Sequence, residues 1–292
     1  MGNSYDLHMF STITPLERDT IVNMYLAGNG ATTIARTLGN NRSEGFIKYN
    51  LLKLGYSIKK PGDYRKYKLN EHYFDEINTH EKAYWLGFLY ADGYNHEGRN
   101  EVKICLNTRD TNHIEKFREA IESNLPIKQN ACNRLKDSIQ IVICSKPFSR
   151  ALAKHGCTQA KSFTIRMPKL EEEVYPSFLR GYFDGDGSVS GKRKKGNFNI
   201  TSNYNFLNDY QQKLVEKCGV NKTKLGTKKI TAHKPTMEKA WALCYTGANN
   251  LRKIYNYLYS TNIYSMPRKK LKFQELITEL PPKQLDNQPS AC

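Results

Sequence analysis

Two aspartates in this sequence could together hold a divalent cation, because each ends an apolar, helix-like segment directly before a glycine. Asp92 closes the segment 84–92, and Asp186 closes the segment 178–186. A carboxylate at the C-terminal end of a helix faces the negative end of the helix dipole, which costs roughly 0.3–1 kcal/mol. Two such carboxylates side by side repel each other unless a cation lies between or beside them. Oxygen ligands without a cluster of histidines or cysteines favour magnesium over zinc, with manganese as a substitute. The alternative is that the two aspartates are unrelated and face solvent.

The elements that position these aspartates are two predicted helices with small residues four positions apart. Gly87 and Ala91 recur on the first helix, and Gly181 and Gly185 on the second. Residues four apart share one helix face, so each helix presents a smooth stripe along which two backbones can approach closely. We therefore predict that Gly87 and Gly181 form a helix–helix interface. The glycines at 93 and 187 are expected to end the helices in the left-handed conformation.

Residues 78–275 repeat one unit of helices and strands, so each of these helices begins its own copy. In both copies the helix precedes a strand, a polar turn, a second strand, a helix, another hairpin and another helix. The segments 101–107 and 197–201 alternate polar and apolar residues, as half-buried strands do. The copied unit predicts an α+β domain with a pseudo-twofold axis.

The two nonamers WLGFLYADG (85–93) and LRGYFDGDG (179–187) resemble the motifs of the LAGLIDADG homing endonucleases, in the form that carries both motifs in one chain. The resemblance implies two αββαββα repeats whose antiparallel sheets form a saddle over double-stranded DNA. It further implies that the last aspartate of each motif, Asp92 or Asp186, binds the catalytic metals, with the backbone carbonyls of Ala91 and Gly185 as auxiliary ligands. The implied activity is a site-specific double-strand break with short 3′ overhangs, made by a monomer.

The resemblance also indicates two lysines that follow the last helix of each repeat. Lys161 and Lys269 occupy these positions, where a flexible point charge could stabilise the scissile phosphates. Either lysine could instead be an ordinary phosphate contact. The motifs depart from the family pattern where Tyr90 replaces a frequent acid and Arg180 replaces a small residue. Neither departure affects the aspartates, so both bear on packing rather than on activity.

Polar residues on one face of the predicted strands are candidates for contacting DNA. Asparagine, threonine and lysine contact base edges or phosphates. A basic turn between the first two strands of the second repeat could clamp a phosphate, and a merely solvated turn is the alternative. The candidate contacts in the strands and this turn are Lys103, Asn107, Lys192, Arg193, Lys194, Lys195, Asn197, Asn199 and Thr201.

Residues 14–56 predict three short helices with the spacing of a helix-turn-helix DNA-binding domain. Thr14 and Pro15 have the residue types that begin a helix, and glycine-containing turns separate the helices. Arg42, Lys48 and the overall charge favour DNA, whereas a three-helix bundle without a ligand is the alternative.

A basic stretch with a Pro-Gly turn signal follows these helices and predicts a linker. Its residues Lys59 and Lys60 could contact phosphates, although a solvated tether would have the same composition. The expected division of the chain is a helix-turn-helix domain at 1–56, a basic linker at 57–77, repeats at 78–170 and 171–280, and a flexible tail at 281–292.

Composition narrows the class of partner. The 292 residues include 45 Lys and Arg against 28 Asp and Glu, a net charge of +17, so a polyanion is expected. No run reaches the roughly 18 apolar residues of a membrane-spanning helix, so DNA is favoured over a membrane and a cytoplasmic location is expected. Seven cysteines lack any Cys-x-x-Cys pair and lie mostly in apolar strings, which predicts reduced core thiols and argues against zinc.

Two other functions share features with this prediction. A transcription regulator can join a LAGLIDADG-like fold to a helix-turn-helix without cutting DNA, but such proteins can lose the acids that both motifs keep here. An RNA maturase could use the same basic saddle on structured intron RNA. Retained acids do not exclude that role.

Overall fold

The structure, a computed structural model, describes residues 13–39, 42–58, 67–129, 137–159, 161, 164–192, 195–228 and 240–278. The chain forms two compact units that divide between residues 68 and 69. Residues 69–77, which the sequence pattern assigns to the linker, lie in the second unit. There Phe74 is fully buried, and its ring packs edge-on against that of Phe148 with 5.3 Å between centroids. Aromatic burial therefore makes this part of the predicted linker a piece of the folded core.

The first unit contains the three helices that the sequence predicts, α1 (Pro15–Leu26), α2 (Ala31–Leu38) and α3 (Glu44–Lys53). At the start of α1, the Thr14 side chain accepts from the Glu17 N–H and the Glu17 side chain accepts from the Thr14 N–H, which satisfies two free donors of the first turn. Apolar side chains from all three helices form a separate small core: Ile21, Ile34, Ile47 and Leu51 are fully buried.

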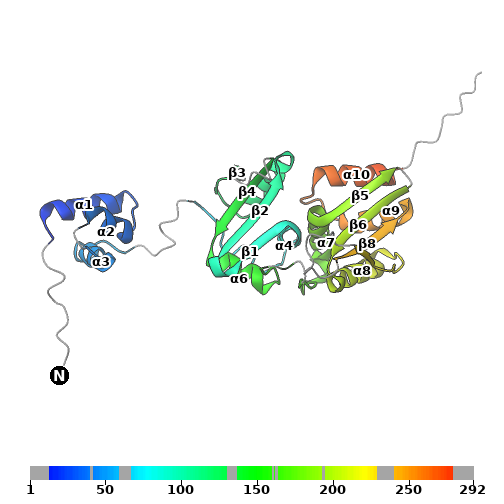
Figure 1. The fold of residues 1–292 in the computed structure, drawn as a ribbon, viewed down its shortest axis with the longest axis horizontal. Coiled ribbons are helices and arrows are strands. Elements are labelled where there is room, and N and C mark those ends of the chain that lie inside the picture. The colour runs from blue at the N-terminus through cyan, green and yellow to red at the C-terminus, as the bar shows by residue number, and fades with distance from the viewer. Residues whose placement is uncertain are drawn as a thin grey trace, which may run out of the picture. The chain divides into compact units, whose positions relative to one another are not determined.

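The second unit consists of two copies of one fold, as the repeat predicts. Both sheets are antiparallel with four strands, and their orders, β1-β2-β4-β3 and β5-β6-β8-β7, are equivalent. Figure 1 shows α4 and α7 side by side between the two sheets. The first copy comprises α4 (His80–Asp92), β1 (Gly93–His96), β2 (Glu101–Asn107), α5 (Thr111–Ala120), β3 (Lys128–Gln129), β4 (Ser138–Cys144) and α6 (Lys146–Lys154). The second comprises α7 (Tyr175–Asp186), β5 (Gly187–Lys192), β6 (Lys195–Ser202), α8 (Tyr204–Cys218), β7 (Gly226–Lys228), β8 (Ala240–Thr246) and α9 (Ala248–Leu258).

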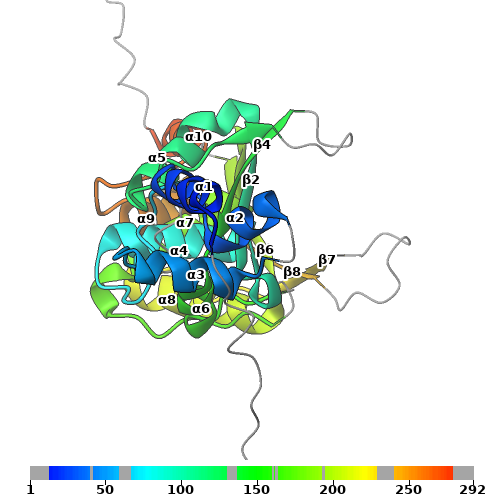
Figure 2. The ribbon, with the colours of Figure 1, turned by 90° about the vertical axis from the view of Figure 1, so that its left-hand side faces the viewer.

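A further helix, α10 (Pro267–Ile277), follows the second copy and breaks the symmetry. The equivalent stretch of the first copy, where it is described between residues 155 and 171, contains no α-helix. Figure 2 shows α10 and α5 at the same end of this unit. The α10 helix therefore packs against the second copy, and the described part of the first copy has no equivalent helix.

Strand alternation separates a buried face from an open face on each sheet. In β2, Val102, Ile104 and Leu106 are buried, while the intervening side chains are partly or fully exposed. In β6, Phe198 and Ile200 are fully buried in the same way. Successive residues of a strand point to opposite faces, so the polar candidates for DNA contacts lie on the open face.

The alternation also corrects the expectation that the cysteines are core thiols. Cys144 and Cys244 are exposed, and of the five cysteines in the described residues only Cys157 is buried; none of the five forms a disulfide. In the string Ile141–Cys144 the two isoleucines are buried, which places Cys144 on the opposite face of β4. The apolar neighbours of a strand cysteine thus show that it points away from the core.

Candidate active site at the ends of the paired helices

The structure brings Gly87 of α4 and Gly181 of α7 together at the closest approach of the two helices. A Cβ atom on Gly87 would lie 2.9 Å from the Tyr182 nitrogen and closer still to the Phe178 carbonyl oxygen. A Cβ atom on Gly181 would lie 2.9 Å from the Phe88 nitrogen and closer still to the Tyr84 carbonyl oxygen. Each glycine therefore lets the backbone of the other helix occupy the space of a side chain, which is the contact that the glycine spacing predicts.

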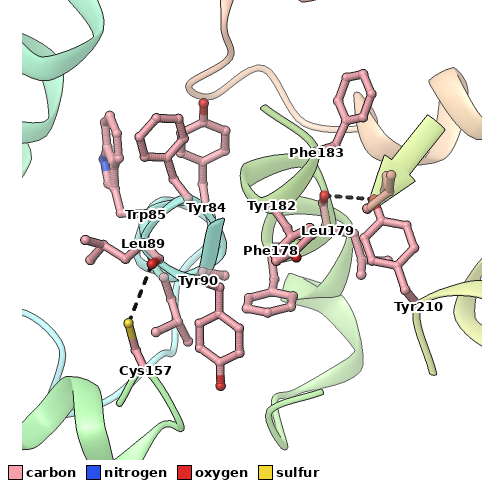
Figure 3. Close-up of a cluster of buried hydrophobic side chains, with 14 of the residues drawn as sticks. Tyr84, Trp85, Leu89, Tyr90, Cys157, Phe178, Leu179, Tyr182, Phe183 and Tyr210 are labelled. Carbon is pink, nitrogen blue, oxygen red and sulfur yellow. Dashed lines mark hydrogen bonds between the residues drawn. The ribbon is translucent and has the colours of Figure 1, made fainter. Parts of the chain in front are cut away.

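Aromatic side chains surround this seam and anchor each helix in its own repeat (Figure 3). The Tyr90 hydroxyl donates to the His155 carbonyl, and the Tyr210 hydroxyl donates to the Leu179 carbonyl at 2.9 Å. Arg180, the other departure from the family pattern, is 1% exposed and donates to the Thr261 carbonyl at 2.8 Å. Both side chains thus find a partner away from the carboxyl ends of the helices, and of the buried guanidinium only Nε has none among the described residues.

The two aspartates meet where α4 and α7 end. A Cβ atom on Gly185 would lie 3.4 Å from Asp92 Oδ2, so the missing side chain leaves room for this carboxylate beside the last turn of α7. Burial, followed by the charge of Asp186, raises the pKa of Asp92 to about 6. Asp186 is open to solvent, yet partial desolvation raises the pKa of its carboxyl as well. Two carboxylates with raised pKa values beside each other form a site that favours a cation.

The glycines that follow the aspartates do not adopt the left-handed conformation predicted for them. Gly93 has φ −80° and ψ 149°, and Gly187 has φ −84° and ψ 163°, so the chain passes directly from helix into strand. Glycine is needed for space instead: a Cβ atom at either position would lie 2.6 Å from the carbonyl oxygen four residues earlier. The sharp exit holds each aspartate at the junction between its helix and the first strand of its sheet.

Both lysines selected from the sequence reach this junction. Lys161 Nζ donates to the Gly93 carbonyl, and Lys269 Nζ donates to the carbonyls of Phe183, Asp184 and Gly185 at 3.0, 2.6 and 2.8 Å. An ammonium group there satisfies the free carbonyls of the helix end and opposes the negative end of its dipole. Burial lowers the pKa of Lys269 to about 8.

The available donor atoms fit a hard cation. In the described parts of the chain no three His, Cys, Asp or Glu side chains are grouped to hold a metal, so Asp92 and Asp186 would act with backbone carbonyls and water. All of these donors are oxygens, as magnesium prefers. Ala91 and Gly185, the predicted carbonyl ligands, face each other at the seam. The Gly185 carbonyl also accepts from Lys269, so a cation would share it with the lysine.

A buried polar network beside the aspartates was not predicted from the sequence. Asp184 is 1% exposed, and its Oδ2 accepts hydrogen bonds of 2.8 Å from the Tyr84 hydroxyl and the Met266 N–H. His113 Nε2 lies 3.0 Å from the Tyr84 hydroxyl oxygen. Because Tyr84 gives its proton to Asp184, Nε2 must donate, which fixes the histidine tautomer. The signal in the sequence was the first acid of the motif segment FDGD, two residues before Asp186.

His113 in this network is expected to make stability depend on pH. Burial lowers the pKa of His113 from 6.5 to about 3, so between these values the unfolded chain binds a proton that the folded chain excludes. This group therefore lowers the free energy of unfolding as pH falls below 6.5, by up to about 1.4 kcal/mol per pH unit, whereas the raised pKa values of Asp92 and Asp184 act in the opposite direction. On going from pH 7.5 to 5.5, urea denaturation should show a more favourable change in the free energy of unfolding for His113→Gln than for the parent. The same change in both proteins would contradict the assignment.

The candidate DNA contacts within the described strands line the open faces of both sheets. Lys103 lies 3.8 Å from Glu101 and is about one-third exposed, and the Asn107 side chain accepts from the Arg109 N–H. The hairpin of β5 and β6 pairs Lys192 with Lys195. Asn197, Asn199 and Thr201 are partly exposed along β6, and Arg193 and Lys194 lie outside the described residues.

In the first unit the two selected basic residues have partners within the unit itself. Arg42 Nε donates to Glu17 at 2.9 Å, and its guanidinium lies 4.2 Å from the centroid of the Phe46 ring. Lys48 pairs with Glu44 one turn earlier on α3 at 2.5 Å. The arginine is thus committed to the packing of α1 against α3. Lys59 and Lys60 lie outside the described residues.

Residues 173–259 match the family model described as a LAGLIDADG-like domain. This segment contains α7 with the second motif and the sheet that follows it, and the first repeat has the same strand order. The second repeat is therefore similar to a LAGLIDADG-like domain. The two helices that carry the motif segments are α4 and α7, and both repeats lie in one chain.

Solved LAGLIDADG structures show a distant similarity to this protein. Meganuclease I-SmaMI bound to uncleavable DNA is 14% identical over 65% of this chain and 88% of its own, with a TM-score of 0.42. I-AabMI bound to uncleaved DNA is 13% identical over 65% and 87%, with a TM-score of 0.43. The I-LtrWI homing endonuclease bound to target DNA is 12% identical over 70% and 89%, with a TM-score of 0.43. No curated protein sequence matches the chain.

Among the residues that the structure describes, none of the helices has both the length and the apolar character needed to cross a bilayer.

Proposed function

We propose that this protein is a LAGLIDADG homing endonuclease, which cuts double-stranded DNA at a specific site. The observation that carries the proposal is the convergence of Asp92 and Asp186 beside two buried lysines at the ends of α4 and α7. Each repeat supplies one aspartate and one lysine, so each could act on one strand of a duplex, whose own twofold axis would coincide with that of the protein. A monomer would then cut both strands, with short 3′ overhangs as the product.

In this proposal Asp92 and Asp186 hold divalent cations, with the carbonyls of Ala91 and Gly185 as auxiliary ligands. Magnesium or manganese, when bound, would acidify a water molecule and neutralise charge on the scissile phosphate. Lys161 and Lys269 hold positive charge at the same junction, where it can stabilise charge that develops on the phosphate. Packing of α4 against α7 excludes water from one side of the site and keeps the two carboxylates together.

Cleavage of a randomised duplex library, with and without magnesium, tests the proposal directly. The expected result is magnesium-dependent recovery of one family of cut sequences. Binding of a defined duplex without cleavage under either condition would contradict the nuclease and favour a transcription regulator. Preferential binding of structured RNA would instead favour a maturase.

The open faces of the two sheets are the proposed DNA-contacting surface. The exposed thiols Cys144 and Cys244 report on this surface, because in register they lie opposite Glu101 and Asn199. With the selected duplex bound and magnesium omitted, alkylation of both cysteines should slow by at least about tenfold, since a specific interface covers its contact surface. Peptide mass spectrometry measures each site separately.

A matched control for this protection is a thiol on the helical side of the second repeat. The exposed position Glu216 on α8 can carry it as Glu216→Cys. Its alkylation should be unaffected by DNA. Protection of this site with unchanged reactivity at Cys144 and Cys244 would place DNA on the helices and contradict the proposed surface.

The first unit is proposed to extend the DNA footprint as a helix-turn-helix domain. Its α3 helix leaves Lys48, Tyr49 and Leu52 exposed, which is an arrangement that a recognition helix requires. Deletion of residues 1–68 should weaken DNA binding and reduce the slope of log K against log salt by about 0.9 for each phosphate that the unit neutralises. Filter binding or fluorescence anisotropy across a salt series measures this slope. An unchanged slope would assign the unit another role.

A further inference from the structure

Three residues at the start of α10 bind two parts of the second unit, the end of α7 and the first repeat. The Met266 N–H donates to Asp184 at 2.8 Å, and Lys269 Nζ reaches the carbonyls at the end of α7. Arg268, between them, pairs with Asp110 of the first repeat, which ends the short 3-10 helix Thr108–Asp110 before α5. The contact joins residues 158 positions apart, and Figure 2 shows α5 and α10 at this end of the unit. The start of α10 therefore bridges the two repeats.

The ion pair between Arg268 and Asp110 has the geometry of a fixed contact. Arg268 Nε lies 3.1 Å from Oδ1 and 3.3 Å from Oδ2 of Asp110, and Nη2 lies 3.2 Å from Oδ2. Two guanidinium nitrogens on one carboxylate restrict orientation as well as distance. The Asp110 side chain is 8% exposed, so water has little access to its carboxylate. The Nε atom of Arg109, at 3.8 Å from Oδ2, is a more distant cationic partner.

The position of Lys269 depends on where α10 begins. A lysine side chain has four flexible torsions, and holding its ammonium group on three carbonyls requires a fixed backbone below it. Met266 attaches that backbone to α7, and Arg268 attaches it to the first repeat. Buried Phe273 and Leu276 hold the rest of α10 to the second repeat, so the ion pair of Arg268 is what ties its first turn to the first repeat.

We propose that Asp110 and Arg268 are positioning residues that hold Lys269 at the carboxyl end of α7, so that the first repeat sets the lysine of the second. The effect of the Lys269 position on cleavage rests on the proposed nuclease function. A pair that merely joined the repeats would affect the sites of both strands, whereas a pair that positions Lys269 affects the strand served by that lysine.

The first test measures the position of Lys269 without any reaction on DNA. Lys269 is 7% exposed, so an amine-reactive reagent should label it slowly in the parent. In Asp110→Asn and Arg268→Gln the labelling rate, followed by peptide mass spectrometry, should rise about tenfold relative to the parent, because the side chain gains access to solvent. Lys161, which is 8% exposed at the equivalent place in the first repeat, is an internal control whose rate should not change.

A matched variant controls for the removal of any ion pair. Glu172→Gln removes a carboxylate that pairs with Lys213 at 2.5 Å and Lys217 at 3.1 Å within the second repeat, away from α10. It should change neither the labelling of Lys269 nor cleavage.

The second test follows the two DNA strands separately, with a different label on each strand of the selected duplex. Asp110→Asn should slow cleavage of one strand about tenfold, equivalent to about 1.4 kcal/mol in the barrier, while the other strand is cut at the parental rate. The slowed strand should be the one slowed in Lys269→Met. In the double variant, Asp110→Asn should slow cleavage no further than Lys269→Met alone, since the residue it positions is already gone.

The outcomes separate this inference from the function on which it rests. Unchanged Lys269 labelling, or equal slowing of both strands, would overturn the positioning role while leaving the nuclease intact. A parent that cuts no duplex would overturn the proposed function, and the labelling experiment would still decide whether Asp110 and Arg268 position Lys269.

Discussion

Asp92→Asn and Asp186→Asn should each abolish cleavage and at the same time raise the melting temperature of the protein. Loss of a ligand to a catalytic cation removes several kcal/mol of transition-state stabilisation. At about 1.4 kcal/mol for each factor of ten, this corresponds to a rate at least about 1,000-fold lower. DNA affinity should stay within about 1–2 kcal/mol of the parent, because asparagine keeps the shape of the side chain.

The expected gain in stability follows from the raised pKa values of the two aspartate carboxyls. Burial and the charge of Asp186 raise the pKa of Asp92 to about 6, which means that folding disfavours its ionised form. Such a carboxyl lowers stability increasingly as pH rises from its unfolded value of 3.8 to about 6, and fully above it. Asparagine removes this penalty, so calorimetry at pH 7.5 should show stabilisation on the order of 1 kcal/mol or more for Asp92→Asn.

An aspartate outside the site provides the control for both measurements. Asp209 lies on α8, and Asp209→Asn should leave cleavage unchanged and should not stabilise the protein. Parental cleavage by either motif variant would contradict the assignment of the aspartates. A motif variant that is inactive but less stable than the parent would show that the carboxylates support the fold instead.

Gly181→Ala should also inactivate the protein, here by separating the motif helices. Its Cβ atom would lie 2.9 Å from the Phe88 nitrogen and nearer still to the Tyr84 carbonyl oxygen, so a single methyl group must move backbone. Overpacking of this kind typically costs about 1–3 kcal/mol. Cleavage should fall by about 100-fold or more, since a displacement of about 1 Å at a reacting centre costs that much. Thermal melting and single-turnover cleavage on the same sample measure both effects.

Gly45 on α3 is the matched glycine for this experiment. A Cβ atom there would meet only Ser43 Oγ, at 3.7 Å, which is an ordinary contact. Gly45→Ala should therefore stabilise the first unit by up to about 1 kcal/mol through helix propensity. If Gly181→Ala behaved like Gly45→Ala, with gained stability and full activity, the paired-helix site would be wrong.

The sequence by itself determined the elements whose residue types follow a regular spacing: the strands, the paired helices and the repeated unit. The alternation in segments 101–107 and 197–201 predicted the strands and their open faces, because side chains of a strand change face at every residue. The small residues at 87 and 181 predicted the helix pairing, because only such residues admit a second backbone. The copied order of elements predicted two equivalent sheets, which the strand orders show.

Local sequence patterns gave wrong predictions where neighbouring backbone atoms or the direction of a strand set the conformation or exposure of a residue. Gly93 was predicted to be left-handed from its place after a helix, yet the chain there turns directly into a strand, and the glycine is required by the nearby Leu89 carbonyl. The predicted core thiol Cys144 is exposed because strand direction, rather than the hydrophobicity of its neighbours, sets its face.

Only the tertiary structure decided which charges meet at the candidate site. Lys269 could be selected from the sequence, but its contact with three carbonyls of α7 depends on where α10 packs. The partners Asp110 and Arg268 are 158 residues apart, and no periodicity links them. Periodic patterns encode the face that an element buries, whereas pairings between distant side chains arise from the packing of whole elements, which here brings the first repeat against the last helix of the second.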